Sequence, residues 1–196
     1  VEILNDLDIK NNSRVFHSHI NNNYKFTPSY SSKERTRSLL KIQDGCDYNC
    51  SFCTIPLARG KSRSDTIENT ISLAQDISET DAKEIVLTGV NIGDFGKKNG
   101  ETFFDLIKQL DKINNINRIR ISSIEPNLLN DQIIEFCNKS EKFVPHFHIP
   151  LQSGSDEILK AMKRDYTVSQ YEDIIYRLWE LRPGMPISTD IKVGFP

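Results

Sequence analysis

The chain places a short apolar run directly before three clustered cysteines, in the stretch Leu39-Leu40-Lys41-Ile42-Gln43-Asp44-Gly45-Cys46-Asp47-Tyr48-Asn49-Cys50-Ser51-Phe52-Cys53. The apolar run predicts a short buried strand, so the cysteines occupy the loop that follows it. The fourth cysteine, Cys137, lies far away, and its place on an apolar helical face predicts a small buried hydrophobe. A disulfide scaffold would spread an even set of cysteines along a smaller chain, so this tight cluster indicates a metal or iron–sulfur site instead.

Length and composition describe a globular protein without a strong charge bias. The chain has 196 residues, of which 37% are hydrophobic and 27% charged, and its formal net charge is -2. It is short for a closed eight-unit β/α barrel, which usually needs about 250 residues. No apolar run reaches the length of a membrane span and no charged-then-apolar leader opens the chain, so we expect a cytoplasmic protein without a membrane partner.

The chain divides into two regions. Residues 1–37 are polar and carry no helical or strand period, so we interpret them as a linker or the remnant of a preceding domain. From residue 38 to 196, apolar runs alternate with segments of helical spacing. The sequence predicts strands over 39–42, 85–87, 118–121, 146–149 and 187–195, with helices between them that include capping boxes at Asp65/Glu68 and Ser169/Glu172. This alternation implies parallel pairing, so we expect an α/β fold built as a partial, open parallel β/α barrel.

Polar residues follow the predicted strands, at the edge where active sites of such barrels lie. The candidates are Thr88, Gly89, Val90 and Asn91, then Ser123 and Glu125, then Gln152 and Ser153, and finally Asp190 and Lys192. If the strands are parallel, these residues and the cysteine loop converge on one mouth. Arg59, Lys61 and Arg63 form a basic patch just after the cysteines, which either contacts phosphates or is a solvated face. His146 and His148 alternate on a strand and so face opposite sides, which makes metal ligation by them improbable.

The spacing Cys46-x-x-x-Cys50-x-x-Cys53 suits a [4Fe–4S] cube in which three irons take one thiolate each. The fourth iron is then open to a substrate or cofactor, as an open metal position is in catalytic sites generally. A structural zinc site is the alternative, and it would make the chain a non-catalytic binding module. Such a site normally needs four ligands, and this loop supplies three.

The cysteine spacing, with Phe52 before the last cysteine, resembles the radical S-adenosylmethionine (SAM) superfamily. Within it, the segments 44–46, 53–56, 59–60, 63–64, 148–155, 162–164 and 166–167 resemble the methylthiotransferases. The segments Leu87-Thr88-Gly89-Val90-Asn91-Ile92-Gly93 and Arg120-Ile121-Ser122-Ser123-Ile124-Glu125-Pro126 look most like the members that act on N6-threonylcarbamoyladenosine in tRNA. The resemblance covers about residues 38–196.

This resemblance implies a cofactor set and a reaction. Cys46, Cys50 and Cys53 would hold a [4Fe–4S] cluster whose open iron chelates SAM, and an electron from a reductase would cleave SAM to methionine and a 5′-deoxyadenosyl radical. The radical would abstract hydrogen from C2 of the modified adenosine at tRNA position 37, where sulfur and a methyl group are then installed. The family positions of the SAM contacts fall on Thr88, Gly89 and Val90 for the methionine moiety, on Ser123, Glu125 and Gln152 for ribose and carboxylate, on Phe52 for adenine, and less firmly on Asp190 and Lys192. No residue is assigned a catalytic role.

The sequence also departs from the family pattern. Family members hold a second cluster on three further cysteines and carry an RNA-binding domain. In this chain three of the four cysteines belong to the loop, so only Cys137 remains and a second three-cysteine cluster cannot form. We therefore expect a radical SAM core fragment, truncated before its last strand, that does not complete turnover alone, with the second [4Fe–4S] cluster present only in the full-length enzyme. A methylthiotransferase for isopentenyladenosine tRNA or for a ribosomal-protein aspartate is the alternative within the family.

Overall fold

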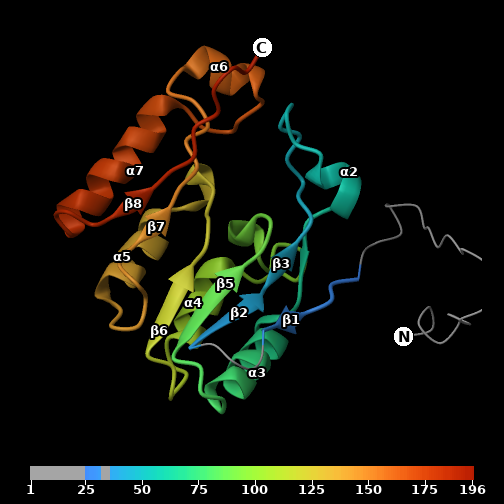
Figure 1. The fold of residues 1–196 in the computed structure, drawn as a ribbon, viewed down its shortest axis with the longest axis vertical. Coiled ribbons are helices and arrows are strands. Elements are labelled where there is room, and N and C mark those ends of the chain that lie inside the picture. The colour runs from blue at the N-terminus through green and yellow to red at the C-terminus, as the bar shows by residue number, and fades with distance from the viewer. Residues whose placement is uncertain (1–24, 32–35) are drawn as a thin grey trace, which may run out of the picture.

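The computed structural model describes residues 25–31 and 36–196. Its main sheet holds three parallel strands, β2 (Arg37–Lys41), β5 (Glu84–Thr88) and β6 (Arg118–Ile121), in the order β1-β2-β5-β6. The arrows of these three strands point the same way in Figure 1. The outer strand β1 (Ser29–Tyr30) runs antiparallel to β2, with Ser29 opposite Lys41. The parallel strands that the sequence predicted are therefore present, and β1 adds an edge strand from a segment that we had expected to be a linker. Arg37, the last residue of that predicted linker, begins β2, and residues 1–24 and 32–35 of it lie outside the described residues.

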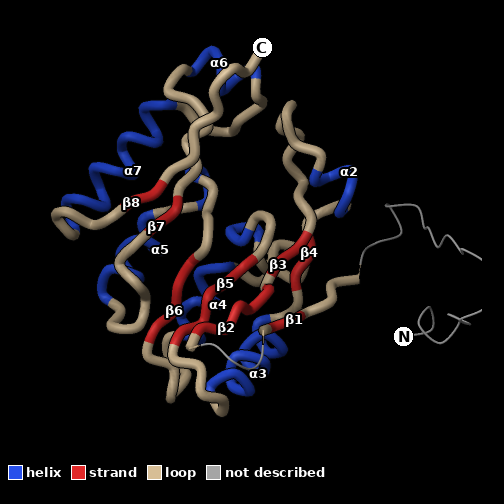
Figure 2. The backbone as a smooth tube through the Cα atoms, viewed as in Figure 1, coloured by secondary structure: helices blue, strands red, loops and turns tan. Residues whose placement is uncertain are grey.

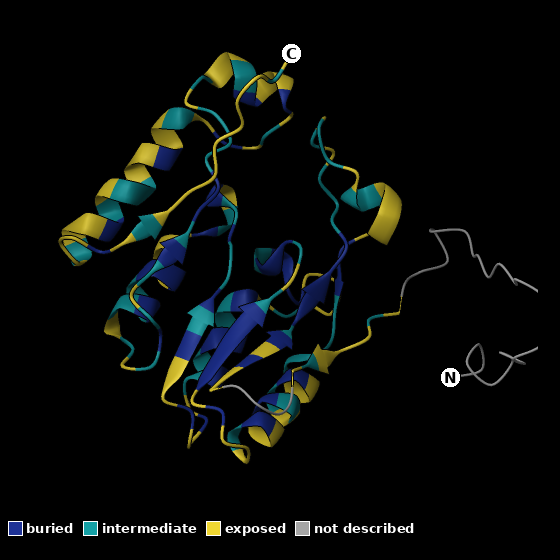
Figure 3. Cartoon of the chain, in the orientation of Figure 1, coloured by how far each residue is buried: buried dark blue, intermediate teal, exposed yellow. Residues whose placement is uncertain are grey.

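Helices cover one face of this sheet. α3 (Ile67–Ser78), α4 (Phe103–Leu110), α5 (Asp131–Lys139) and α7 (Val168–Leu181) pack side by side in chain order. Strand residues at alternate positions, such as Leu40, Ile85, Leu87 and Ile119, are fully buried, and so are Leu106 and Leu110 of α4. In Figure 3 the dark blue of buried residues covers much of the strands of this sheet and parts of the helices packed on it. The helical and strand periods in the sequence thus meet in one apolar layer.

The opposite face of the sheet is partly open. Leu39 was expected to be buried, but it is 49% exposed, because Leu39 and Lys41 point away from the helices that cover Leu40 and Ile42. On the same face Glu84 is buried and pairs with Arg37, Arg118 and Arg120 at 3.5, 3.2 and 2.9 Å. These charged residues therefore lie on the open face of the sheet. The described strands do not close into a barrel around that face.

Beyond β6 the sheet continues as short pairings. β7 (Phe147–His148) runs parallel to β8 (Ile187–Ser188), and the Ile124 amide donates to the His148 carbonyl at 3.1 Å. The predicted strand over 187–195 is much shorter, with only an isolated bridge from Ile191 to Gln152 beyond Ser188. β7, which pairs with this segment, cannot continue as a strand, because Pro150 has no amide donor and Gln152 adopts a left-handed backbone with φ 63°. Figure 2 shows how little of this segment is strand.

Two helices begin at residues other than those predicted. α3 is capped by Thr66, whose side chain accepts from the Asn69 amide at 3.2 Å, whereas the Asp65 carboxylate bonds the Thr66 amide and the Asn69 side chain. α7 has a capping box formed by Thr167 and Gln170, two residues before the predicted one. In both cases several Ser, Thr or Asp residues compete for the cap, and the packing of the helix selects among them.

No helix in the described part of the chain is long and apolar enough to cross a membrane.

Candidate functional site

The cysteine loop, residues 45–54, leaves β3 (Gln43–Asp44) and leads into α2 (Ile55–Arg59), beyond the carboxyl ends of β2 and β5 (Figure 1). β3 pairs antiparallel with β4 (Arg63–Ser64), so the two ends of this excursion are held together. Gly45 begins the loop with φ 71°, and a Cβ there would lie 2.2 Å from the Lys61 carbonyl oxygen. The Cys46 amide donates to the Gly60 carbonyl at 3.1 Å. Only glycine permits this close approach, which fixes where the first cysteine lies.

A buried carboxylate supports the base of the loop. Asp44 pairs with Lys41, Arg59 and Arg63 at 2.8, 3.2 and 3.0 Å and also accepts from the Gly45 amide. Burial by itself raises the pKa of Asp44, but hydrogen bonds from Lys41, Gly45 and Arg59 outweigh it and hold that pKa below its ordinary value. Of the predicted basic patch, Arg63 is buried and bound to Asp44, whereas the Arg59 and Lys61 side chains are 52% and 75% exposed. Arg59 and Arg63 both pair with Asp44, and of the three only Arg63 is removed from solvent.

The three clustered cysteines are free, half-buried thiols. The Tyr48 amide donates to the Cys46 sulfur at 3.4 Å, and Arg164 Nη1 donates to the Cys50 sulfur at 3.0 Å. Burial raises the pKa of Cys46, and the nearby Cys50, Asp94 and Cys53 add to that effect, so the three sulfurs share one electrostatic environment. Cys137 is buried in α5, and burial raises the pKa of its thiol far above the usual value. Its position confirms the prediction of a small buried hydrophobe.

The donor atoms of the loop distinguish the two predicted kinds of site, a zinc ion and an iron–sulfur cluster. Within residues 25–31 and 36–196, no three His, Cys, Asp or Glu side chains are grouped closely enough to hold one metal ion. A single zinc, about 2.3 Å from each sulfur, would need the thiols within about 4 Å of one another. A [4Fe–4S] cube gives each thiolate its own iron, so its sulfurs stand farther apart. Three unpaired thiols with N–H donors on two of the sulfurs fit a cluster better than a zinc ion.

Gln43 connects the cysteine loop to the segment after β5, and the sequence analysis missed it. Its side-chain oxygen accepts from the amides of Val90 and Asn91 at 3.0 and 2.7 Å. Its nitrogen donates to the carbonyls of Asp44 and Gly45 and to the Ser62 hydroxyl. Gln43 is completely buried, so all these contacts are made away from bulk water. No period or motif announced this role, since a glutamine after a strand has many uses.

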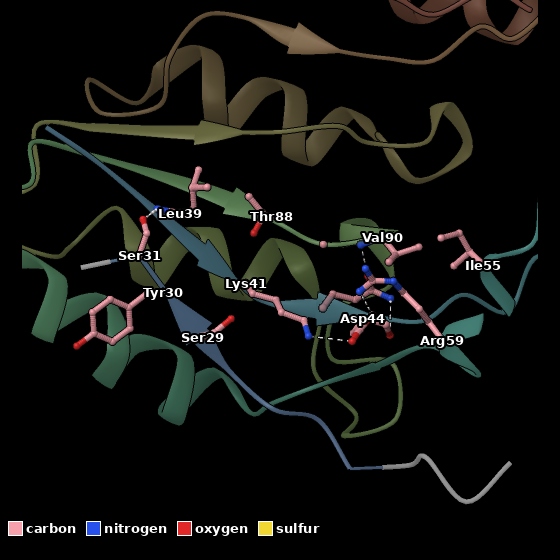
Figure 4. A pocket seen from close by; sticks show the side chains of 12 residues that line it. Ser29, Tyr30, Ser31, Leu39, Lys41, Asp44, Ile55, Arg59, Thr88 and Val90 are labelled. Carbon is pink, nitrogen blue, oxygen red and sulfur yellow. Dashed lines mark hydrogen bonds and ion pairs between the residues drawn. The ribbon is translucent and has the colours of Figure 1, made fainter. Parts of the chain in front are cut away.

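A hollow of about 740 Å³ opens beside this junction on the uncovered face of the sheet. The predicted residues Thr88, Gly89 and Val90 line it, together with Gln43 and Asp44 (Figure 4). A Cβ on Gly89 would lie 2.8 Å from Ile92 and 3.0 Å from the Gln43 carbonyl, so the chain passes close to β3 here. The hollow is large enough for a small-molecule ligand.

The remaining predicted residues lie in two further groups. Glu125 forms an ion pair with Arg164, the residue that also contacts Cys50. The Lys192 ammonium lies 4.5 Å from the centre of the Phe52 ring, and the Lys192 amide donates to the Gln152 carbonyl. Asp190 pairs with His148 at 3.1 Å, and Ser123 is half-buried at the end of β6. The structure thus joins Cys50 to Glu125 and Phe52 to Lys192, whereas Asp190 faces a histidine.

The chain is similar to several known proteins. The family model described as the radical SAM superfamily matches residues 40–196. Threonylcarbamoyladenosine tRNA methylthiotransferase MtaB of Bacillus subtilis is 44% identical over 165 residues, which is 83% of this chain and 37% of that protein. The tRNA-2-methylthio-N(6)-dimethylallyladenosine synthase of Orientia tsutsugamushi (strain Boryong) is 43% identical over 162 residues, or 81% of this chain and 36% of that protein. This chain therefore spans well under half the length of these relatives.

Among solved structures, the radical S-adenosylmethionine methyltransferase TsrM from Kitasatospora setae, with cobalamin and a [4Fe–4S] cluster bound, superposes with a TM-score of 0.61. The match covers 78% of this chain and 30% of TsrM at 15% identity. The cobalamin-dependent S-adenosylmethionine radical enzyme OxsB gives a TM-score of 0.60 over 78% of this chain and 23% of its own, also at 15% identity. At such identities the likeness shows the fold alone.

Proposed function

This chain belongs to the radical SAM superfamily, and from that premise we propose that it is the SAM-cleaving part of a tRNA methylthiotransferase that acts on N6-threonylcarbamoyladenosine. Membership implies a [4Fe–4S] cluster and SAM. The proposed substrate is supported by curated relatives of that name that are 44%, 41% and 40% identical to this chain. Because the chain covers only 37 to 40% of those proteins, the complete reaction is proposed for the whole protein rather than for this part of it.

The observation that carries the proposal is the junction at Gln43. One buried side chain ties the base of the cysteine loop to the Thr88–Gly89–Val90 segment beside the hollow. We propose that Cys46, Cys50 and Cys53 hold the cluster and that the Thr88 segment binds the methionine part of SAM. A cluster and its SAM must be held in register for one electron to pass between them, and a shared buried anchor provides that register.

When bound, the cluster supplies the electron that cleaves SAM into methionine and a 5′-deoxyadenosyl radical. The residues of this chain bind and orient the groups. Gly89 lets the backbone pass close to β3, and Gln43 fixes the direction of the Val90 and Asn91 amides. The further proposed contacts to SAM are Phe52, Ser123, Glu125, Gln152, Asp190 and Lys192. The unpartnered, buried Oε1 of Gln152 supports its place in that set, since among the described residues it has no hydrogen-bond donor.

For the whole protein we propose tRNA as the macromolecular substrate, a reductase as the electron donor, a cytoplasmic setting that follows from that substrate, and a second cluster held outside this stretch. Residues 38–196 would then be the radical SAM domain and residues 1–37 its connection to a preceding part.

Anaerobic reconstitution with iron and sulfide tests the core of the proposal. We expect a brown protein with broad visible absorbance, about four irons per chain, and reductant-dependent conversion of SAM to 5′-deoxyadenosine. Cys50→Ala should lose the iron and the SAM cleavage, and Cys137→Ala, which removes the buried thiol of α5, should keep both. A colourless protein with one tightly bound zinc would establish the binding-module alternative instead.

The substrate is tested separately with the whole protein. We expect the methylthio product from tRNA that carries N6-threonylcarbamoyladenosine and none from tRNA that carries N6-isopentenyladenosine, also called dimethylallyladenosine. Since a dimethylallyladenosine synthase is 43% identical to this chain, the opposite preference would reassign the substrate and leave the radical SAM chemistry in place.

A further inference from the structure

Arg164 is a buried cation that bridges the cysteine loop and a carboxylate far away in the chain. Its side chain is 4% exposed. Nη1 donates to the Cys50 sulfur at 3.0 Å, and Nη2 forms an ion pair with Glu125. The guanidinium also lies 5.1 Å from the centre of the Tyr166 ring. The resemblance to known families gave Arg164 no role, and the Glu125 carboxylate, expected to contact SAM, is bound to this arginine.

The backbone is shaped to aim Arg164 at this place. After α6 (Asp156–Ala161), Lys163 adopts a left-handed conformation with φ 58°. The Arg164 amide donates to the Leu159 carbonyl at 2.9 Å, and the Lys163 amide to the Lys160 carbonyl at 3.0 Å, which is the Schellman pattern of helix ends. Glycine normally occupies the left-handed position, and lysine there costs about 1 kcal/mol. The chain thus turns sharply and directs Arg164 inward at some expense in stability.

The cysteine loop is docked on the same turn by two more hydrogen bonds. The Ser51 amide donates to the Met162 carbonyl at 3.1 Å, and the Ser51 hydroxyl donates to the Ala161 carbonyl at 3.0 Å. Since Ser51 follows Cys50 directly, these bonds hold the cysteine loop against the end of α6. The turn after the same helix carries Arg164, which donates an N–H to the Cys50 sulfur. The contact between Arg164 and Cys50 is therefore fixed from both sides.

Arg164 remains charged in this setting. Burial lowers the pKa of a guanidinium, but the facing carboxylate of Glu125 outweighs burial and raises the pKa of Arg164 further above its usual value. Its Nε is also buried and has no hydrogen-bond acceptor among the described residues. A hydrogen bond and a positive charge at a thiolate ligand stabilise the more negative, reduced state of an iron–sulfur cluster. Glu125 lies on the other side of the cation and partly offsets its field.

We propose that Arg164 and Glu125 form a charge pair that sets the reduction potential of the cluster through Cys50, with Arg164 raising the potential and Glu125 lowering it. Both are positioning residues, since they act through the Cys50 sulfur. The inference rests on the cluster of the proposed function and adds to it a role for Arg164 and a second role for Glu125, which is also a predicted contact to SAM.

Potentiometric titration of the reconstituted protein, followed by visible absorbance and electron paramagnetic resonance, tests the pair. We expect Arg164→Gln to shift the midpoint potential of the cluster to more negative values and Glu125→Gln to shift it to more positive values. Arg164→Lys keeps the charge and should lie between Arg164→Gln and the unaltered protein. Arg177→Gln is the matched control, because Arg177 pairs with Glu135 and Glu180 at 2.8 and 2.7 Å on α5 and α7 without touching a cysteine.

Shifts of both variants in the same direction, or shifts no larger than that of Arg177→Gln, would overturn the proposal. If Arg164→Gln fails to fold or to retain iron, Glu125→Gln and Arg164→Lys decide, and the absence of a positive shift in Glu125→Gln overturns it. If the unaltered protein binds no iron, the proposed function itself has failed. That result is distinct from a protein that binds the cluster but whose midpoint potential is unchanged by substitution of Arg164 or Glu125.

Discussion

Asp44→Asn tests whether the base of the cysteine loop depends on one buried carboxylate. The substitution keeps the shape of the side chain and an acceptor for the Gly45 amide, and it removes the charge that faces three cations. Arg63, 7% exposed and 3.0 Å from Asp44, is then left as a buried cation without a carboxylate. Removing one partner of a buried ion pair costs about 3 to 5 kcal/mol. Because Arg63 retains bonds to the carbonyls of Lys25, Arg59 and Lys61, we place the cost at the lower end, about 3 kcal/mol.

For a chain of this size, such a loss lowers the melting temperature by about 6 to 12 °C. Calorimetry or urea unfolding of the chain measures it. Asp105→Asn is the control, since Asp105 pairs with Lys108 at the same 2.8 Å that separates Asp44 from Lys41, but on an exposed helix surface. That variant should change the free energy of unfolding by no more than about 0.5 kcal/mol. Equal effects of the two substitutions would refute the reasoning from burial.

The pH dependence gives a second check on Asp44. Its pKa in the folded chain is held below the ordinary value near 3.8. A carboxyl with a depressed folded pKa contributes stability that is complete above its unfolded pKa and is lost as the pH falls through the folded one. The stability difference between the unaltered chain and Asp44→Asn should therefore be largest above about pH 5 and shrink toward pH 3. A difference that stays constant over this range would show that the carboxylate charge is not its source.

Three further predictions concern the loop. Gly45→Ala should destabilise the chain by more than about 2 kcal/mol in urea unfolding and abolish iron retention, whereas Gly100→Ala, also at φ 71° but with open space around it, should cost only about 1 kcal/mol and keep the iron. Cys50→Ser should retain less than half of the iron of Cys137→Ser, measured by iron analysis after desalting. Gln43→Leu should lower the free energy of unfolding by about 2 to 3 kcal/mol and weaken SAM binding in calorimetric titration, because it leaves buried amides without their acceptor; unchanged SAM affinity would contradict the role of that anchor.

The sequence determined the local elements and the chemistry of the loop. Alternating apolar periods gave the parallel strands β2, β5 and β6 and the helices that cover them, because periodicity depends only on which face is buried. The spacing of Cys46, Cys50 and Cys53 pointed to the radical SAM superfamily, since three thiols so close together suit few other groups. Helix starts were less certain, and Thr66 and Thr167 took the caps that neighbouring residues were expected to hold.

Only the tertiary structure decided which partners the polar residues take. Gln43 has no periodic or motif signature, and the motifs that contain Asp44 and Arg164 assign them no partner, yet each of the three contacts residues that lie 15 to 114 positions away in the chain. A glutamine, aspartate or arginine in isolation prefers water, and its role is set when folding removes that water and leaves one neighbour able to satisfy it. The sequence therefore identifies the thiols, and the folded chain decides which charges and hydrogen bonds reach them.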